Sequence, residues 1–208
     1  MTTTELTERY INEHRSIKEC LKKGLINYSS LARLIAKDLE IENKASKEAI
    51  LIAARRFKDK IKTKIIEEDI VKLFRKSNME IKNNIVFYTL EKNIFPDSLV
   101  EIEKTIKKNN DLFFAIEGTK SITVIIQRQN KELVEKKFRN NIIRKKENLS
   151  LITISSPGIE KTPGAVNYLT GILFDNGVNI EEFMSCYHDT LILIETKDIG
   201  KVINLFDF

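Results

Sequence analysis

Apolar residues recur every three or four positions through the first third of the chain, a spacing typical of helices with one buried face. The pattern predicts helices over residues 5–23, 31–39, 46–61 and 67–76. Gly24 is the expected end of the first helix. Expected N-caps are Asn27, Ser29 or Ser30 for the second helix and Ser46 for the third. No proline occurs among the first 95 residues, which agrees with a helical start.

Near Ile81 the periodicity changes from helical spacing to β-branched and aromatic runs typical of strands. A strand, a helix, two strands and a helix are expected in that order. They are assigned to residues 84–90, 98–108, 112–116, 121–126 and 131–138. The same order is then repeated over residues 149–154, 163–176, 178–184, 190–194 and 198–206. The second copy lacks a final strand, so its open edge should be completed by another segment or another chain.

Two copies of one supersecondary pattern predict an α+β protein with a pair of ferredoxin-like βαββα modules. Each module would be one antiparallel sheet with two helices on a single face. The expected domains are a helical, helix-turn-helix-like domain over residues 1–78, a first module over 79–146 and a second over 147–208.

Positive charge is concentrated in the helical third. Residues 1–78 hold 18 Lys and Arg against 12 Asp and Glu, giving +6, while the remaining 17 against 18 give −1. The third predicted helix is strongly basic, and Arg55, Lys58 and Lys62 share one of its faces. A face of this kind either contacts DNA phosphates or is simply the solvated side of a helical bundle. The candidate nucleic-acid contacts are Lys47, Arg55, Arg56, Lys58 and Lys62.

Catalytic and metal-binding patterns are not evident. Cys20 and Cys186 lie far apart, as do His14 and His188, so neither a disulfide framework nor a metal site is expected. There is no glycine-rich phosphate loop and no nucleophile elbow. The chain shows no signal peptide and no apolar run of about 20 residues. We therefore expect a cytoplasmic protein that is not an enzyme and carries no cofactor.

The stretch SSPGIEKTPGAVNYLTGILFDNGVNIEEF, from Ser155 to Phe183, contains two of the three prolines and four of the seven glycines. Thr162 is the expected N-cap of the helix, Pro163 its first residue, and Gly164 a position that lets a ligand approach closely. The free N–H groups of the first helical turn favour an anion such as a carboxylate.

This stretch, with the preceding LSLITISSPGI and the following MSCYHDTLILIE, resembles an ACT domain, the amino-acid-sensing module of aspartate kinases and other biosynthetic enzymes. The resemblance covers about residues 149–206; residues 81–140 fit the same pattern more loosely, without the Pro-Gly pair. The whole chain resembles archaeal proteins described as predicted regulators of amino-acid metabolism. The resemblance implies that loop amides hold a ligand carboxylate and that Asn179, facing the loop across a domain interface, holds its ammonium group. The implied ligand contacts are Glu160, Lys161, Thr162, Pro163, Gly164, Ala165, Asn179 and Ile180.

The leading hypothesis is an amino-acid sensor, dimeric through its ACT modules, that regulates metabolism by binding DNA. The alternative is a stand-alone regulatory subunit that docks on an amino-acid biosynthetic enzyme. A third possibility is a structural dimerisation module without a ligand.

Overall fold

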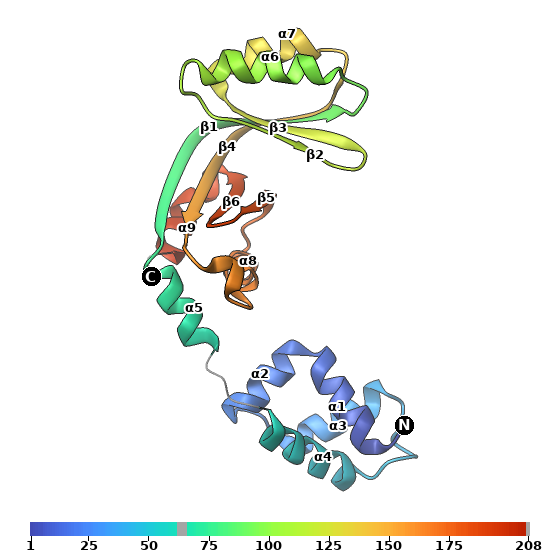
Figure 1. Cartoon of the computed structure of the whole chain (residues 1–208). Coiled ribbons are helices and arrows are strands. Elements are labelled where there is room, and N and C mark those ends of the chain that lie inside the picture. The colour runs from blue at the N-terminus through green and yellow to red at the C-terminus, as the bar shows by residue number, and fades with distance from the viewer. Residues whose placement is uncertain (62–65, 207–208) are drawn as a thin grey trace. The chain divides into compact units, whose positions relative to one another are not determined.

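A computed structural model describes residues 1–61 and 66–206 of the chain (Figure 1). The chain divides into two compact units, Met1–Ile65 and Ile66–Phe208, and each is described by itself. We call them the helical unit and the sheet unit.

The helical unit contains α1 (Thr3–Glu13), α2 (Arg15–Lys23), α3 (Tyr28–Asp38) and α4 (Lys47–Lys60). The prediction of a single helix over residues 5–23 is wrong, because His14 adopts a non-helical conformation between α1 and α2. The His14 ring stacks on Tyr10, and its Nδ1 lies 2.8 Å from the Tyr10 carbonyl oxygen, which also accepts from the N–H of the C-cap residue His14. A side chain that competes for the terminal carbonyl favours the end of a helix at that point.

The predicted caps at Gly24 and Ser46, and one of the N-caps offered for α3, are confirmed. Gly24 ends α2 in the left-handed conformation, with φ of 71°. Of the three N-cap candidates for α3, Asn27 is the cap, since its Oδ1 accepts a hydrogen bond from the Ser30 N–H. Ser46 caps α4 by accepting from the Ala49 N–H. The four helices enclose one apolar core that includes Ile11, Leu21, Leu31, Ile35, Ile50 and Phe57.

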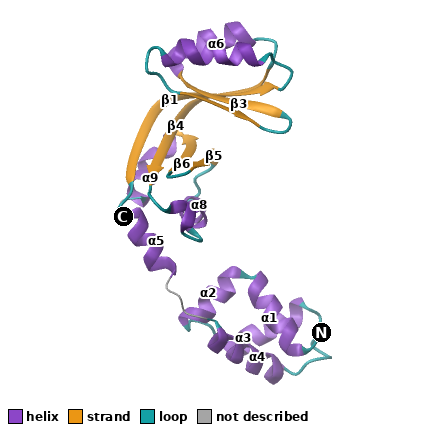
Figure 2. Ribbon diagram, in the orientation of Figure 1, coloured by secondary structure: helices purple, strands orange, loops and turns teal. Residues whose placement is uncertain are grey.

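The sheet unit opens with helix α5 (Ile66–Phe74) and contains one antiparallel six-stranded sheet in the order β2-β3-β1-β4-β6-β5 (Figures 1 and 2). The strands are β1 (Asn78–Glu91), β2 (Phe113–Glu117), β3 (Ser121–Gln127), β4 (Ile142–Ser155), β5 (Ile180–Cys186) and β6 (Asp189–Glu195). The helices are α6 (Pro96–Lys107), α7 (Lys131–Phe138), α8 (Ala165–Asp175) and α9 (Ile199–Leu205). Short 3-10 turns occupy Arg128–Asn130, Ile159–Lys161 and Thr196–Asp198.

The two long central strands belong to both halves of the sheet. β1 and β4 have 14 residues each, and their pairing changes register between Lys82 and Ile85. Asn84 and Asn148 both have φ of 58° beside this irregularity, a conformation that asparagine tolerates better than most residues. The sheet curls across these strands, which arch through Figure 1. The structure therefore shows one curled sheet where the sequence predicted two separate ones.

The strand missing from the second repeat is residues 78–82 of β1, which pair with residues 151–155 of β4. The sequence predicted that this edge is completed either by another segment or by another chain. The structure shows another segment of the same chain. On the far side of the register change, residues 142–149 of β4 pair with residues 85–90 of β1 in the other half.

Three apolar clusters hold the sheet unit together. One lies under α6 and α7 and includes Ile102, Ile106, Val134 and Phe138. A second lies under α8 and α9 and includes Leu169, Leu173, Ile192 and Val202. A third, which includes Phe87, Ile125, Leu151 and Leu193, unites strands from both halves. Ile70 and Phe74 of α5 belong to the second cluster, so α5 packs within the sheet unit although we expected it in the helical domain.

Candidate functional site

The loop between β4 and α8 is built around two glycines with positive φ. Gly158 has φ of 91° and precedes the 3-10 turn Ile159–Lys161. Gly164 has φ of 88° and is the N-cap of α8. The expectation that Thr162 is the N-cap and Pro163 the first helical residue is wrong. The Thr162 hydroxyl instead donates to the Gly158 carbonyl, 2.9 Å away, so it closes the turn rather than the helix.

A hollow of about 470 Å³ lies beside this loop at the start of α8. Its lining residues are Ile159, Glu160, Thr162, Gly164, Val166, Asn167, Thr170 and Ser185. The Ala165 N–H donates to the Thr162 carbonyl, and the Tyr168 N–H makes the bond to Gly164 that begins the helix. The Val166 and Asn167 amides between them belong to the first turn, whose N–H groups have no partner inside the helix. One wall of the hollow is therefore favourable for an anion.

Glu160 is the only charged side chain among the lining residues that the structure describes. Its carboxylate lies 3.8 Å from Lys161 Nζ and 3.7 Å from His188 Nδ1, both beyond hydrogen-bond distance. It can therefore accept from a cation that enters the hollow. A carboxylate beside a helix N-terminus offers complements for both charges of a zwitterion.

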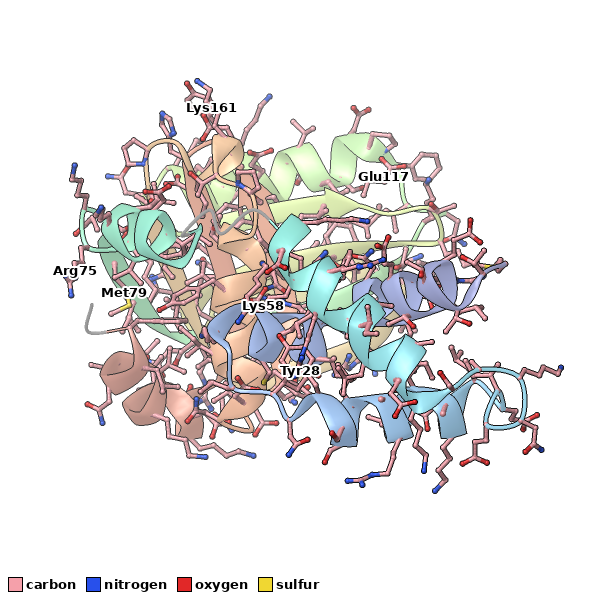
Figure 3. The ribbon with its side chains drawn as sticks, turned by 90° about the horizontal axis from the view of Figure 1, so that it is seen from below. Tyr28, Lys58, Arg75, Met79, Glu117 and Lys161 are labelled. Carbon is pink, nitrogen blue, oxygen red and sulfur yellow. The ribbon has the colours of Figure 1, made fainter. Side chains whose placement is uncertain are left out.

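The predicted ligand residues are divided by the structure. Glu160, Thr162 and Gly164 line the hollow, whereas Lys161, Pro163 and Ala165 do not. The Lys161 side chain is 82% exposed and extends away from the loop (Figure 3). Ala165 is buried in the core under α8.

Five lining residues were missing from the prediction: Ile159, Val166, Asn167, Thr170 and Ser185. Val166 and Thr170 are four positions apart on α8, a spacing that places them on one face and could have been read from the sequence. Ser185 reaches the hollow only because β5 lies beneath the start of α8, which no local pattern encodes.

Beneath the loop, three buried polar atoms have no hydrogen-bond partner within residues 1–61 and 66–206: Ser156 Oγ, His188 Nδ1 and Thr190 Oγ1. Thr190 is paired in register with Ser185, which lines the hollow. An unpartnered buried polar group costs free energy, so this end of the sheet is less stable than the apolar rows beside it.

Ser156 and Ser150 form a matched pair for testing this cost. Both side chains are fully buried at or just beyond β4, but Ser150 Oγ donates to Asn83 Oδ1 at 2.7 Å and lies 2.9 Å from Thr196 Oγ1. Ser150→Ala should lower the free energy of unfolding by about 0.5–1.5 kcal/mol, because it removes the hydrogen bonds of a buried side chain to the exposed Asn83 and the half-buried Thr196. Ser156→Ala should leave it unchanged or raise it by up to about 1 kcal/mol. Urea unfolding of both variants measures the difference, and equal losses would contradict the assignment of Ser156 as unpartnered.

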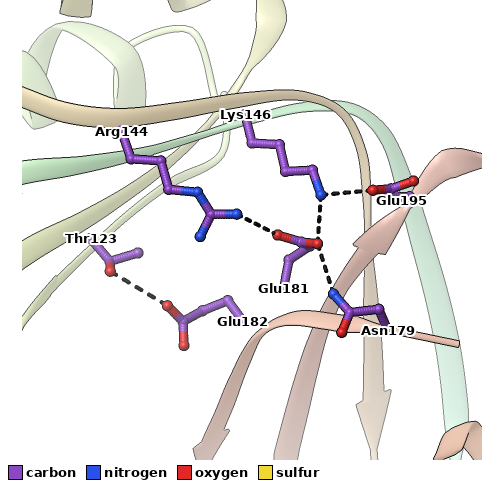
Figure 4. Close-up of polar contacts among 7 residues, drawn as sticks. All are labelled: Thr123, Arg144, Lys146, Asn179, Glu181, Glu182 and Glu195. Atoms are coloured by element: carbon purple, nitrogen blue, oxygen red, sulfur yellow. Dashed lines mark hydrogen bonds and ion pairs between the residues drawn. The ribbon is translucent and has the colours of Figure 1, made fainter.

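Asn179 and Ile180 stand at the start of β5, after α8 has ended, and neither lines the hollow. The Asn179 amide donates to Glu181 Oε1 at 2.9 Å (Figure 4). Glu181 also accepts from Lys146 at 2.6 Å and Arg144 at 3.0 Å, and its side chain is only 5% exposed. Lys146 reaches Glu195 as well, at 2.7 Å. Asn179 therefore belongs to an ionic network that fastens β5 to β4.

The network lowers the pKa of its carboxylates. A hydrogen bond from Lys146 is the main cause of the lowered pKa of Glu181. Lys146 is also the main cause of the lowered pKa of Glu195, which falls to about 2. On the neighbouring side of β4, hydrogen bonds from Lys131 and then Lys145 bring the pKa of Glu147 to about 2.

These pKa shifts predict acid sensitivity of the sheet unit. Because the folded pKa values lie below the ordinary value of 4.5, the unfolded chain takes up protons first, and stability is lost as the pH falls from about 5 toward 2. The urea midpoint should decrease steadily across that window. In the Glu181→Gln variant the midpoint should decline less steeply with falling pH. In the Glu132→Gln variant, which changes an exposed side chain, it should follow the wild type. A midpoint that stays constant or rises on acidification would contradict the ionic network.

The candidate nucleic-acid residues lie on and after α4 of the helical unit. Lys47, Arg55 and Arg56 are exposed, Lys58 is half-buried, and Lys62 lies outside the described residues. The Arg55 guanidinium lies 5.2 Å from the centre of the Tyr28 ring at the start of α3. Lys58 Nζ lies 3.6 Å from the position that a Cβ would take at Gly24. Tyr28 and Lys58 are labelled in Figure 3.

In the described ranges, no group of three or more His, Cys, Asp or Glu side chains is placed to hold a metal ion. None of the helices between residues 1–61 and 66–206 has the length and apolar character that crossing a membrane requires.

Residues 144–206 match the family described as ACT domain, a segment that contains the loop and its hollow. Among solved structures, the chain is similar to aspartate kinase from Clostridium acetobutylicum, with 19% identity and a TM-score of 0.52. That similarity covers 62% of this chain and 33% of the other, so the chain corresponds to about a third of that enzyme. No curated protein matches the sequence.

Two other solved structures show the same fold. Aspartokinase alpha and beta subunits match with a TM-score of 0.54 and 12% identity, over 67% of this chain and 99% of that one. The regulatory subunit of aspartate kinase from Thermus flavus matches with a TM-score of 0.51 and 8% identity, over 62% and 94%.

Proposed function

With residues 144–206 forming an ACT domain, we propose that the chain is an amino-acid-responsive regulatory protein whose ligand binds in the hollow at the start of α8. The observation that carries this proposal is the composition of the hollow. First-turn amides of α8 suit a carboxylate, and the Glu160 carboxylate suits an ammonium group. A free amino acid carries both charges on adjacent atoms. The protein would act as a sensor and not as an enzyme.

Within this proposal, the two halves of the sheet act as paired ACT-like modules, and two copies of the chain associate. Val166 and Phe174 are exposed apolar side chains on α8, eight positions apart and thus on one face. Burying them against a second copy would remove apolar surface from water. In such a dimer, Asn179 and Ile180 of one copy would approach the loop of the other.

The output that we propose is DNA binding by the helical unit. Arg55 and Arg56 are both exposed on α4, whose Ala53 and Phe57 are buried. Each phosphate contact would release counterions and make binding weaken with salt. Ligand binding would alter this output only if the two states of the protein differ in affinity for the amino acid.

Docking on an amino-acid biosynthetic enzyme remains a second candidate because of Ile52. This side chain is 47% exposed and lies on the same outer face of α4 as Arg55. An apolar residue among cations suits a protein surface as well as a duplex. Duplex binding that is lost on Arg55→Glu would favour the DNA reading, whereas no duplex binding at any salt concentration would favour docking.

A thermal-shift screen of the twenty amino acids on the full chain tests the sensor proposal. At one hundred times its dissociation constant, a ligand stabilises the folded state by about 2.7 kcal/mol, a readily measured shift. Glu160→Gln should abolish most of the shift. Asp175→Asn makes the same change in charge at the other end of α8, where it should leave the shift intact. If no amino acid raises the melting temperature of the wild type, the proposal fails.

A further inference from the structure

A second hollow, of about 340 Å³, lies within the helical unit. It is lined by Asn12, Lys18, Lys22, Phe57, Lys60 and Ile61. Among the described residues of this lining, every charged side chain is a lysine. That composition contrasts with the loop hollow of the sheet unit, where the charged side chain that the described residues contribute is a glutamate.

The fold brings these lysines together from two helices. Lys18 and Lys22 are four positions apart on α2 and so share a face, while Lys60 comes from the last turn of α4. Lys60 is two positions from Lys58, which turns it about 200° around the helix axis. The site is therefore separate from the face of α4 that carries Arg55 and Lys58.

The hydrogen-bond acceptors near the three lysines are fewer than the N–H donors of their ammonium groups. Lys18 Nζ donates to the neutral amide oxygen of Asn12 at 2.6 Å. Lys22 pairs with Glu19 at 3.0 Å, and Lys60 pairs with Glu8 at 2.8 Å, but neither carboxylate belongs to the lining. Each ammonium has three N–H donors and only one acceptor in these contacts.

Three like charges around a small volume repel one another, and an anion between them would offset that repulsion. A free amino acid fits this site poorly, because the lining residues that the structure describes include no carboxylate to accept from its ammonium group. A phosphate offers several charged oxygen acceptors and no donor that needs a partner. The volume also accommodates more than one phosphate group.

We propose that this hollow binds the phosphate groups of a phosphorylated compound through Lys18, Lys22 and Lys60. The phosphate can belong to a small phosphorylated molecule or to a nucleic-acid backbone, since both present the same chemistry. The proposal does not depend on amino-acid binding by the ACT domain.

Calorimetric titration of the full chain with inorganic pyrophosphate, at constant ionic strength set by chloride, tests the site. Saturable binding is expected, and Lys18→Gln combined with Lys60→Gln should weaken it at least about tenfold, as for two lost charge-assisted hydrogen bonds. The matched control combines Lys37→Gln with Lys44→Gln, which removes the same charge from exposed positions of the helical unit outside the hollow. The control should bind within about twofold of the wild type. If both double variants bind pyrophosphate equally weakly, the proposed site is contradicted, because the loss of affinity would then follow from the lower net charge alone.

A duplex DNA arm separates the two sources of phosphate. If saturating duplex displaces pyrophosphate and the Lys18/Lys60 variant weakens both, the ligand is a nucleic-acid backbone. If pyrophosphate binds equally well with duplex present, the ligand is a small phosphorylated compound. Absence of saturable binding for both pyrophosphate and duplex would overturn the proposal. Melting temperatures of the variants verify that each is folded.

Discussion

Residues 144–208 produced alone are expected not to fold, whereas residues 66–208 should unfold in one cooperative transition. The ACT match begins at residue 144, but the fourth strand of that half of the sheet is residues 78–82 of β1. Without residues 78–82, β4 keeps its pairing with β6 but loses its pairing with β1 over residues 151–155, and this side of β4 becomes an open edge. The core also loses Met79, Ile81 and helix α5.

Circular dichroism during urea titration distinguishes the two fragments. The longer fragment should show a sigmoidal transition, and the shorter one a shallow decline without a folded baseline. Cooperative unfolding of residues 144–208 would contradict the role that we assign to residues 78–82.

Phe74→Ala should lower the free energy of unfolding of the sheet unit by about 3–5 kcal/mol, the usual cost of removing a buried phenylalanine side chain. Phe74 is 2% exposed in the core under α8, and its ring stacks on Tyr168 with centroids 5.9 Å apart. Chemical denaturation followed by near-ultraviolet circular dichroism reports on this core.

The matched control is Phe95→Ala, which removes a ring that is 80% exposed just before α6. Its effect should stay within about 0.5 kcal/mol, as for most surface substitutions. Equal effects of the two substitutions would show that α5 does not pack in the core of the sheet unit.

Much of the fold could be predicted because its signals are local. The helix expected over residues 131–138 has the same bounds as α7, and Gly24 and Ser46 mark helix ends through their own backbone and side-chain preferences. Short apolar runs such as residues 121–126 identified strands in the same way.

The length of β1 and β4 could not be predicted, because their outer parts are polar. Residues 142–148 contain Arg144, Lys145 and Lys146, charges that indicate a loop when the sequence is read by itself. In the structure those charges are paired with Glu181, Glu135 and Glu195. Partners so distant in sequence leave no trace in the local pattern.

The candidate site was predictable to the same extent. Glu160, Thr162 and Gly164 follow from the glycine-rich loop, whose motif is continuous in sequence. The N-cap was misassigned because the Thr162 hydroxyl donates to the Gly158 carbonyl oxygen, and Gly164, in the left-handed conformation, is the N-cap instead. Ser185 depends on how α8 packs over β5, a tertiary contact that the motif does not contain.

Sharing of β1 and β4 between the two halves also constrains how such a protein can evolve. Neither half of the sheet has a full set of strands of its own. A recombination event that replaced one half with the corresponding half of a related protein would therefore break β1 and β4 in the middle. Residues 78–206 must therefore be inherited as a single block, and divergence between the halves has to proceed by substitutions within it.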